Sequence, residues 1–187
     1  MSSYYEFTGE TIRVGDATLH RIRAVTDLPR HGVRAGDVGG WIAGTANLSG
    51  GARVFGDAWV YGDAEVFGGA QVSGRAWVFG DAQVFGGAEV SGAARVFGDA
   101  EVCVSQDVLT VGPIGSESVT ATLFRTANSH RLHVGCWDGQ VDDLAAEVER
   151  RSAAWDADPA TAARWVAEYT ALETLCRARM AGWAAIQ

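Results

Sequence analysis

The chain has 187 residues, a formal net charge of −8, and 15 basic residues that are all arginine. An acidic chain is a poor general binder of nucleic acid, because affinity for the phosphate backbone comes largely from Lys and Arg. No apolar run approaches the roughly 18 residues that a membrane span needs, and the first residues lack a signal-peptide pattern, so we expect a soluble protein.

Residues 1–40 are interpreted as an N-terminal β segment. Residues 4–25 predict β-strands that are broken at "TGE" and "VGDA", where glycine allows the backbone to change direction. The chain then passes through an arginine-rich loop and reaches "GGWI", which opens the next segment. We therefore expect a short β-structure that leads directly into a repeat.

Residues 41–114 contain an internal repeat of six residues. Thirteen aliphatic residues, from Ile42 to Ile114, are spaced by six without a slip, and Gly and Ala follow most of them at fixed offsets. An aliphatic residue and an alanine point inward on either side of one outward residue, and the glycine turns the chain. Three such sides make one coil, so the sequence predicts a mainly β protein with a triangular parallel β-helix of just over four coils.

Stacking each coil on the one before it arranges the outward side chains in columns. Trp59, Trp77 and Arg95 share one flat face of the predicted prism. Two tryptophans in the middle of an outer face are costly to leave in water, so we predict that this face is an oligomer interface. The alternative is that the C-terminal part of the same chain covers them.

Residues 115–187 predict a C-terminal ββαα domain. The stretches "SVTATLFRTA" and "RLHVGCW" predict a hairpin that turns around Asn128 and Ser129. An amphipathic helix is expected in residues 138–155. A second, longer helix follows, with Asp158 as its N-cap and Pro159 at its first position.

The phrases "LHRIRAV", "GDVGGWI", the Gly-Ala hexads, "IGSESVTATLFRT" and "VGCWDGQVDDL" follow one another in this order. In this respect the chain resembles a family of phage and prophage hexapeptide-repeat proteins, often labelled polymer-forming or transferase-like. The resemblance covers almost the whole chain. It implies a left-handed parallel β-helix, a homotrimer, and a place in the cytosol of the bacterial host.

We predict that the protein is a non-catalytic binder of a small anionic, nucleotide-like ligand. Arginine offers paired donors to phosphate, and aromatic faces stack on bases. The candidate ligand-binding residues near the N-terminus are His20, Arg21, Arg23, Arg34 and Trp41, with Arg30 and His31 in the same loop. Those near the other end of the repeat are Ser116, Thr120 and Arg125. For a phage protein, one use would be to sequester a nucleotide immune signal of the host, an anti-defence role.

Other interpretations of these residues remain open. Arg21 and Arg23 could simply pair with Asp16, Asp27 or Asp37 at the surface. The chain could be a purely structural trimeric scaffold, or a DNA mimic built on the column of Asp63, Asp81 and Asp99. It could also be a hexapeptide-type acyltransferase, which would need a histidine base. All four histidines lie outside residues 41–114.

We expect no metal, no cofactor and no catalytic residue set. The three cysteines, Cys103, Cys136 and Cys176, lack metal-type spacing and favour reduced thiols over a disulfide framework. Strand periodicity places His130 and His133 on opposite sides of a strand. Cys136 precedes a predicted helix, where a thiolate would be stabilised, but we expect it to be buried and inert.

Overall fold

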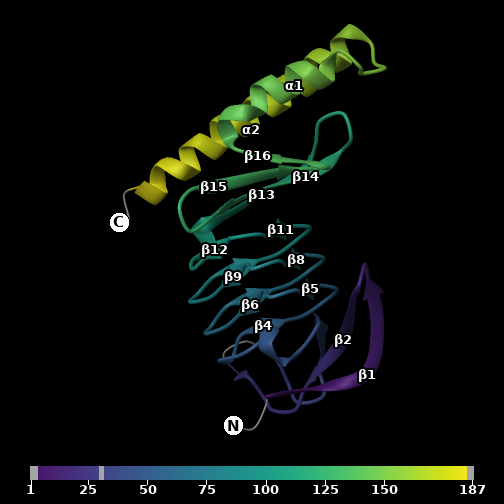
Figure 1. The fold of residues 1–187 in the computed structure, drawn as a ribbon, viewed down its shortest axis with the longest axis vertical. Helices are drawn as coiled ribbons and strands as arrows, with labels where there is room; N and C mark the ends of the chain where they lie inside the picture. The colour runs from purple at the N-terminus through teal and green to yellow at the C-terminus, as the bar shows by residue number, and fades with distance from the viewer. Residues whose placement is uncertain (1–3, 30–31, 185–187) are drawn as a thin grey trace. The chain divides into compact units, whose positions relative to one another are not determined.

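The computed structural model describes residues 4–29 and 32–184. The chain divides into two compact units, with the boundary between Ser105 and Gln106. Figure 1 shows the elements of both units. Each unit is described here by itself.

The N-terminal unit begins with an antiparallel hairpin. Strand β1 (Tyr5–Val14) pairs with β2 (Ala17–Ala24), and Val14 lies opposite Ala17 across a two-residue turn. The pairing register shifts between Phe7 and Thr11. Both predicted interruptions are therefore present: "VGDA" forms the hairpin turn, and "TGE" forms an irregularity within β1.

The hairpin continues into a β-solenoid. Strand β2 pairs antiparallel with β3 (Val38–Ile42), which in turn pairs in parallel with the first strand on the same face of the coils. Two-residue strands stack on three faces, in the orders β5-β8-β11, β6-β9-β12 and β4-β7-β10. The strands are β4 (Arg53–Val54), β5 (Trp59–Val60), β6 (Glu65–Val66), β7 (Gln71–Val72), β8 (Trp77–Val78), β9 (Gln83–Val84), β10 (Glu89–Val90), β11 (Arg95–Val96) and β12 (Glu101–Val102).

The interior of the coils is filled as the repeat predicts. From Val60 to Val102 every inward valine has no exposed surface, and the same holds for each alanine from Ala52 to Ala100. The corner glycines from Gly56 to Gly98 have φ between 63° and 71°, a left-handed conformation that side chains disfavour. The structure confirms a triangular parallel β-helix.

The first hexad departs from the pattern. Residues Thr45–Asn47 form a short 3-10 helix, η2, so Ala46 is exposed and Asn47 is buried. The Asn47 Nδ2 group donates to the carbonyl oxygens of Gly62 (3.0 Å) and Ala64 (2.8 Å) in the next coil. The asparagine therefore closes the first corner with hydrogen bonds to the backbone of the coil that follows.

The solenoid has three full coils, between Arg53 and Val102, which is fewer than the spacing of six suggests. The six-residue spacing continues through Val108 and Ile114, but these residues lie in β13 (Val108–Ile114). That strand pairs antiparallel with β14 (Val119–Arg125), in the second unit. Spacing alone does not distinguish a further coil from an ordinary strand, because both place aliphatic residues inward.

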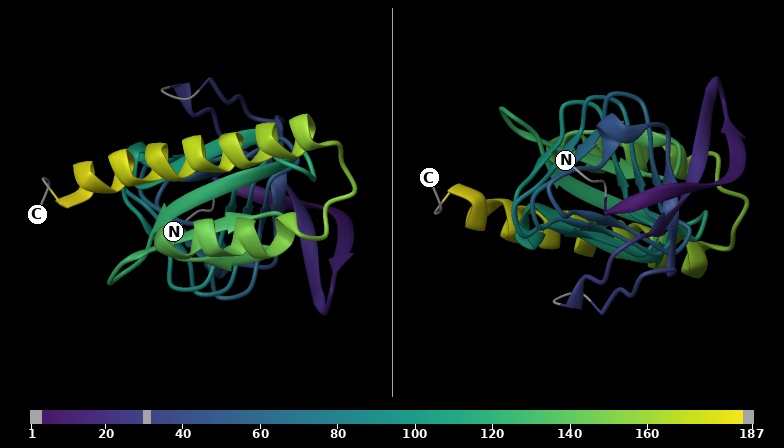
Figure 2. Two further views of the ribbon diagram at one scale, coloured as in Figure 1. Left: turned by 90° about the horizontal axis from the view of Figure 1, so that it is seen from above. Right: turned by 90° about the horizontal axis from the view of Figure 1, so that it is seen from below.

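The C-terminal unit is a four-stranded antiparallel sheet with two helices. The sheet order is β13-β14-β15-β16, with β15 at His130–Val134 and β16 at Trp137–Gly139. The predicted hairpin is thus present and gains a strand on each side. The helices α1 (Leu144–Ser152) and α2 (Pro159–Ala184) lie side by side and antiparallel (Figure 2). A 3-10 helix, η4 (Val141–Asp143), precedes α1, and another, η3 (Ser105–Asp107), spans the boundary between the two units in the sequence.

The sheet and the helices share one core. Its buried residues are Ala121, Leu123, Leu132, Val134, Val141, Leu144, Val148, Tyr169, Leu172, Cys176 and Trp183. As predicted, Asp158 caps α2: its Oδ1 accepts hydrogen bonds from the backbone N–H groups of Ala160 and Thr161, both at 3.0 Å. Hydrogen bonds from the Thr161 side chain and then from these backbone groups hold the pKa of Asp158 below its usual value.

We predict that the C-terminal unit loses stability when the pH falls below about 6.5, the ordinary histidine pKa. The His130 Nε2 atom accepts a 3.0 Å hydrogen bond from Val141 N at the start of η4, which requires a neutral ring. Burial lowers the pKa of His130, while nearby Asp142 raises it and Arg177 lowers it. The unfolded chain therefore takes up a proton at a higher pH than the folded chain does, and acid favours unfolding.

The measurement is the free energy of unfolding at several pH values, for the wild type and for His130→Gln. The other titrating groups are common to both proteins and cancel in the comparison. The variant should show a flatter dependence between about pH 7 and pH 5, across the ordinary histidine pKa. Equal slopes would contradict the role given to His130.

Candidate ligand-binding site

The N-terminal unit contains a cavity of about 410 Å³ beside the first coil. The N-terminal strands, the loop before β3 and the first coil all contribute to its wall. Its lining residues are Tyr4, Tyr5, Ile22, Ala24, Leu28, Gly32, Val33, Asp37, Val38, Gly39, Leu48, Ala52, Arg53, Val54, Phe55 and Gly56. The wall is mostly apolar and carries one basic and one acidic side chain, a composition typical of small-molecule sites.

Arg53 is the basic residue of the cavity. It occupies the outward position of β4, yet it is only 7% exposed. Its guanidinium carbon lies 5.9 Å from the centre of the Phe55 ring. Burial lowers the pKa of Arg53, and the charge of Glu89 acts in the opposite direction. A guanidinium remains charged under these conditions, so the wall contains a largely buried cation.

Two tyrosines close the cavity on the N-terminal side. The Tyr4 hydroxyl donates to the carbonyl oxygen of Ala52 at 2.7 Å, and the Tyr5 hydroxyl donates to that of Leu48 at 3.4 Å. Burial raises the pKa of both phenols. Both hydroxyls therefore stay protonated and hold the N-terminal segment against the first coil.

The arginines predicted near the N-terminus do not line this cavity. Arg23 pairs with Glu6 through Nε and Nη2, at 3.0 and 2.5 Å from one carboxylate oxygen. Arg21 Nη1 lies 3.4 Å from Asp57 Oδ1. The acidic partners proposed from the sequence, Asp16, Asp27 and Asp37, are thus not the ones that these two side chains contact. The difference arises because the β1–β2 pairing and the first coil bring other carboxylates closer.

Among the predicted residues of this region, the structure brings Trp41 and Arg21 together. The Arg21 guanidinium lies 5.0 Å from the centre of the Trp41 ring. His20 packs on Phe7, with ring centres 4.9 Å apart. Arg34 is exposed, and its backbone N–H donates to Asp37. Two further predicted residues, Arg30 and His31, lie outside the described residues.

The predicted residues of the C-terminal unit do not form one pocket either. Ser116 follows β13, Thr120 is near the start of β14, and Arg125 is at the end of β14. Five residues of extended strand separate Thr120 from Arg125 by about 17 Å. The Arg125 guanidinium instead approaches the buried carboxylate of Asp107, with 3.8 Å between Nη1 and Oδ1.

The predicted oligomer face carries a continuous ladder of side chains. Trp59 and Trp77 stack with ring centres 4.6 Å apart and an interplanar angle of 10°. The Arg95 guanidinium lies 4.8 Å from the centre of the Trp77 ring. Trp41 is the register partner of Trp59. We call Trp41, Trp59, Trp77 and Arg95 the tryptophan ladder.

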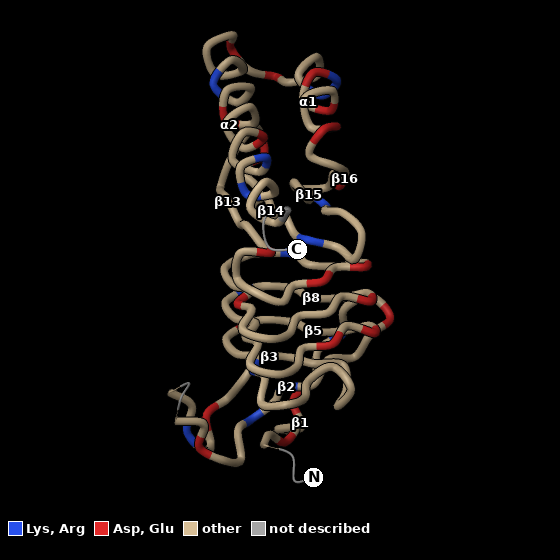
Figure 3. The backbone as a smooth tube through the Cα atoms, turned by 90° about the vertical axis from the view of Figure 1, so that its left-hand side faces the viewer, with Lys and Arg blue, Asp and Glu red and all other residues tan. Residues whose placement is uncertain are grey.

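A second feature of the coils is charge. Acidic residues recur along them and gather along one edge (Figure 3). Asp63, Asp81 and Asp99 recur once in each coil. Such a column follows from the repeat itself, and these three residues do not line the cavity beside the first coil.

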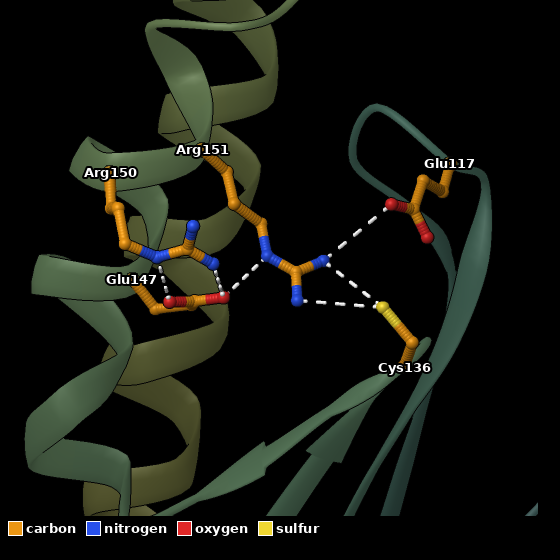
Figure 4. A network of polar contacts seen from close by, with 5 residues as sticks. All are labelled: Glu117, Cys136, Glu147, Arg150 and Arg151. Carbon is orange, nitrogen blue, oxygen red and sulfur yellow. Dashed lines mark hydrogen bonds and ion pairs between the residues drawn. The ribbon is translucent and has the colours of Figure 1, made fainter.

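Cys136 lies in an exposed polar network of the C-terminal unit (Figure 4). The Arg151 guanidinium donates to its sulfur through Nη1 and Nη2, both at 3.5 Å, and also approaches Glu117. Hydrogen bonds from Arg150 and then Arg151 hold the pKa of Glu147 down to about 2, so this carboxylate stays ionised.

The expectation of a buried Cys136 is wrong. The cysteine does not adjoin a helix start but lies in the tight turn between β15 and β16, where Val134 pairs with Trp137. The sequence shows that Trp137 follows Cys136, but it does not show the turn that exposes the thiol. The fully buried cysteine is Cys176, which packs in the core from α2.

We predict that a thiol-alkylating reagent labels Cys136 in the folded protein and spares Cys176. Cys176 has no exposed surface, and burial raises its pKa to about 11, so few thiolates form there at neutral pH. The measurement is peptide mass spectrometry after brief alkylation, with Cys136→Ser as the control. Labelling of Cys176 at the same rate before unfolding would contradict the packing described.

Neither a protein-family model nor a curated protein matches this chain. Across the described residues, no helix is both long enough and apolar enough to cross a bilayer. Within the same residues, no three His, Cys, Asp or Glu side chains gather closely enough to hold a metal ion. The resemblance to phage hexapeptide-repeat proteins therefore stays a prediction, and the site is interpreted from its geometry.

Proposed function

We propose that the protein is a non-catalytic binder of a small anionic, nucleotide-like ligand, which it holds in the cavity beside the first coil. The observation that carries this proposal is a buried guanidinium, that of Arg53, in the wall of a cavity of about 410 Å³. This volume lies within the range of small-ligand sites, roughly 300 to 1,000 Å³. The phage-type resemblance adds a use: sequestering a nucleotide signal of host defence in the bacterial cytosol.

The chemistry of the wall supports an anion with an apolar or aromatic body. A desolvated guanidinium forms short, charge-assisted hydrogen bonds to phosphate or carboxylate oxygens. Phe55 and the two tyrosines add aromatic surface to the wall, on which a base ring can pack. The proposal thus keeps the ligand class predicted from the sequence and moves its site to other residues.

The test is a thermal-shift screen with mononucleotides, cyclic dinucleotides, ADP-ribose derivatives, dinucleotide cofactors and acyl-coenzyme A. A ligand at about 100 times its dissociation constant adds roughly 2.7 kcal/mol of stability, which such a screen detects. Arg53→Gln should abolish the shift. Arg75→Gln is the matched control, because Arg75 is exposed at a corner of the same coils.

Three outcomes would overturn this proposal. A panel without any shift would exclude the nucleotide-like ligand. A thermal shift that survives Arg53→Gln but is lost in Arg21→Gln or Arg125→Gln would place the ligand at the residues predicted from the sequence instead. A shift with acyl-coenzyme A alone would favour the acyltransferase.

The second candidate function is a homotrimeric scaffold, and the tryptophan ladder favours it. Trp59 and Trp77 are only half-buried, although tryptophan is among the costliest side chains to leave in water. Aromatic surface in a flat face is typical of protein interfaces. The two functions are compatible, because no ladder residue lines the cavity.

A further inference from the structure

We infer that Phe55 is the residue on which the planar ring of the ligand stacks, so that the cavity selects purine nucleotides over sugar phosphates that lack a base. This inference rests on the proposed function and assigns its specificity to one side chain. The geometry behind it is a corner aromatic residue that lies in the cavity wall and has no other ring stacked on it.

Aromatic side chains at the corners of the coils stack along their columns. Tyr61 stacks on Phe79, and Phe79 stacks on Phe97, with 5.1 Å between the ring centres in each pair. Phe67 stacks on Phe85, also with 5.1 Å between the ring centres. Each of these rings therefore has a face covered by another ring of the same chain.

Phe55 holds the equivalent position at the third corner but lacks such a neighbour. The residue one coil further along its column is Ser73, and Ser91 follows. Among the described residues, no aromatic ring stacks on Phe55. The Arg53 guanidinium lies 5.9 Å from the ring centre, which is near the outer limit of a cation–π contact. The guanidinium therefore does not cover the ring as a stacked ring would.

The exposure of Phe55 agrees with this arrangement. The residue is 37% exposed, whereas the five stacked corner aromatics are less exposed. Val38, which is 55% exposed, lines the same cavity. Two large apolar side chains that the chain leaves in water thus belong to one wall. A planar base that covers them would remove this surface from water.

The two tyrosines of the wall are poorer platforms for a ligand ring. Tyr4 and Tyr5 pack edge to face on each other, with ring centres 5.3 Å apart. Their hydroxyls donate to carbonyl oxygens of the first coil, and Tyr5 is buried. A ligand ring would have to displace these contacts to stack there, so the ring that it meets is that of Phe55.

Stacking on one phenyl ring sets an order among ligands. A purine base offers two fused rings, a pyrimidine base offers one, and a sugar phosphate offers none. Loss of a stacked base typically weakens binding by roughly five- to hundredfold. The preference should therefore follow the size of the base and depend on the ring of Phe55.

The experiment measures dissociation constants by calorimetry for AMP, CMP and ribose 5-phosphate, which share the phosphorylated sugar and differ in the base. The wild type should bind AMP at least about tenfold more tightly than ribose 5-phosphate, with CMP between them. Phe55→Ser should lower the affinity for AMP to that for ribose 5-phosphate, and it should leave the affinity for ribose 5-phosphate unchanged. Phe55→Tyr, which keeps a ring, should retain most of the preference.

Phe55→Ser suits this test because serine occupies the same column in the next two coils, so the repeat accepts it there. Phe67→Ser is the matched control. Phe67 is a corner aromatic of the same coil, stacks on Phe85, and is not among the described residues of the cavity wall. The control variant should bind AMP as the wild type does.

The outcomes separate this inference from the proposed function. If AMP and ribose 5-phosphate bind the wild type equally tightly and Arg53→Gln abolishes both, the anion site stands and this inference fails. If the preference for AMP survives Phe55→Ser, the inference fails in the same way. If no compound of the series binds, both fail.

Discussion

Gly115→Ala is expected to lower the free energy of unfolding of the C-terminal unit by about 3 kcal/mol, the sum of a backbone and a packing penalty. Gly115 has φ of 67°, a conformation that costs any other residue energy. A methyl group there would also overlap the ring of Tyr169, which is buried in the core. The backbone N–H of Gly115 donates to Glu168 Oε2 at 2.6 Å, so the turn cannot move away without losing this bond.

The measurement for Gly115→Ala is chemical unfolding followed by the helical circular dichroism signal, since both α-helices of the described residues belong to this unit. Gly182→Ala is the control. A Cβ at Gly182 meets no atom within 4 Å, and alanine favours a helix by up to about 1 kcal/mol over glycine. If Gly115→Ala unfolds at the wild-type denaturant concentration, the close packing of Tyr169 against Gly115 is wrong.

Trp77→Ala is expected to convert the proposed trimer to a monomer and to cost about 2 kcal/mol within each chain, the sum of one aromatic and one cation–π contact. Trp77 stacks on Trp59 and lies under the Arg95 guanidinium, so its removal ends these two contacts. An aromatic pair contributes roughly 0.5–1.5 kcal/mol beyond its buried area, and an exposed cation–π contact about 0.5–1 kcal/mol. The same side chain supplies apolar surface at the centre of the proposed interface.

The mass in solution, measured by sedimentation equilibrium, distinguishes the two effects of Trp77→Ala. Gln83→Ala is the control, because Gln83 is an exposed outward residue one hexad further along, on a different face. Gln83→Ala should leave the proposed trimer intact. The proposal that the tryptophan ladder forms an oligomer interface would be contradicted by a wild-type protein that sediments as a monomer. A Trp77→Ala variant that keeps an oligomeric wild-type mass would contradict it too.

The sequence predicts the coils well because each position in the repeat has one physical role. A valine such as Val78 fits inside, and a glycine such as Gly80 turns the corner. Outward residues that are one coil apart in the sequence then stack in columns, and Trp59 does stack on Trp77. Prediction fails where the repeat ends, since Val108 keeps the spacing but pairs with the antiparallel β14.

The candidate site was harder to predict, because its wall joins segments that are distant in sequence. Arg53 reads as an ordinary outward residue of the repeat, and the residues at positions 4, 5, 28 and 33 that share the cavity wall with it lie far from it in the sequence. Asp37 was considered only as a surface partner for arginine. The sequence shows an arginine at an outward position, but strand periodicity gives no information about what covers that position.

The in-register coils also have a consequence for how such a chain can change over evolutionary time. Each strand between β4 and β12 bonds only to the strands directly before and after it on its face. Duplicating or deleting one whole coil would restore the same neighbours at the junction, because the inward residues repeat with that period. The length of the β-solenoid is therefore free to vary by whole coils, while the cavity beside the first coil keeps the same wall.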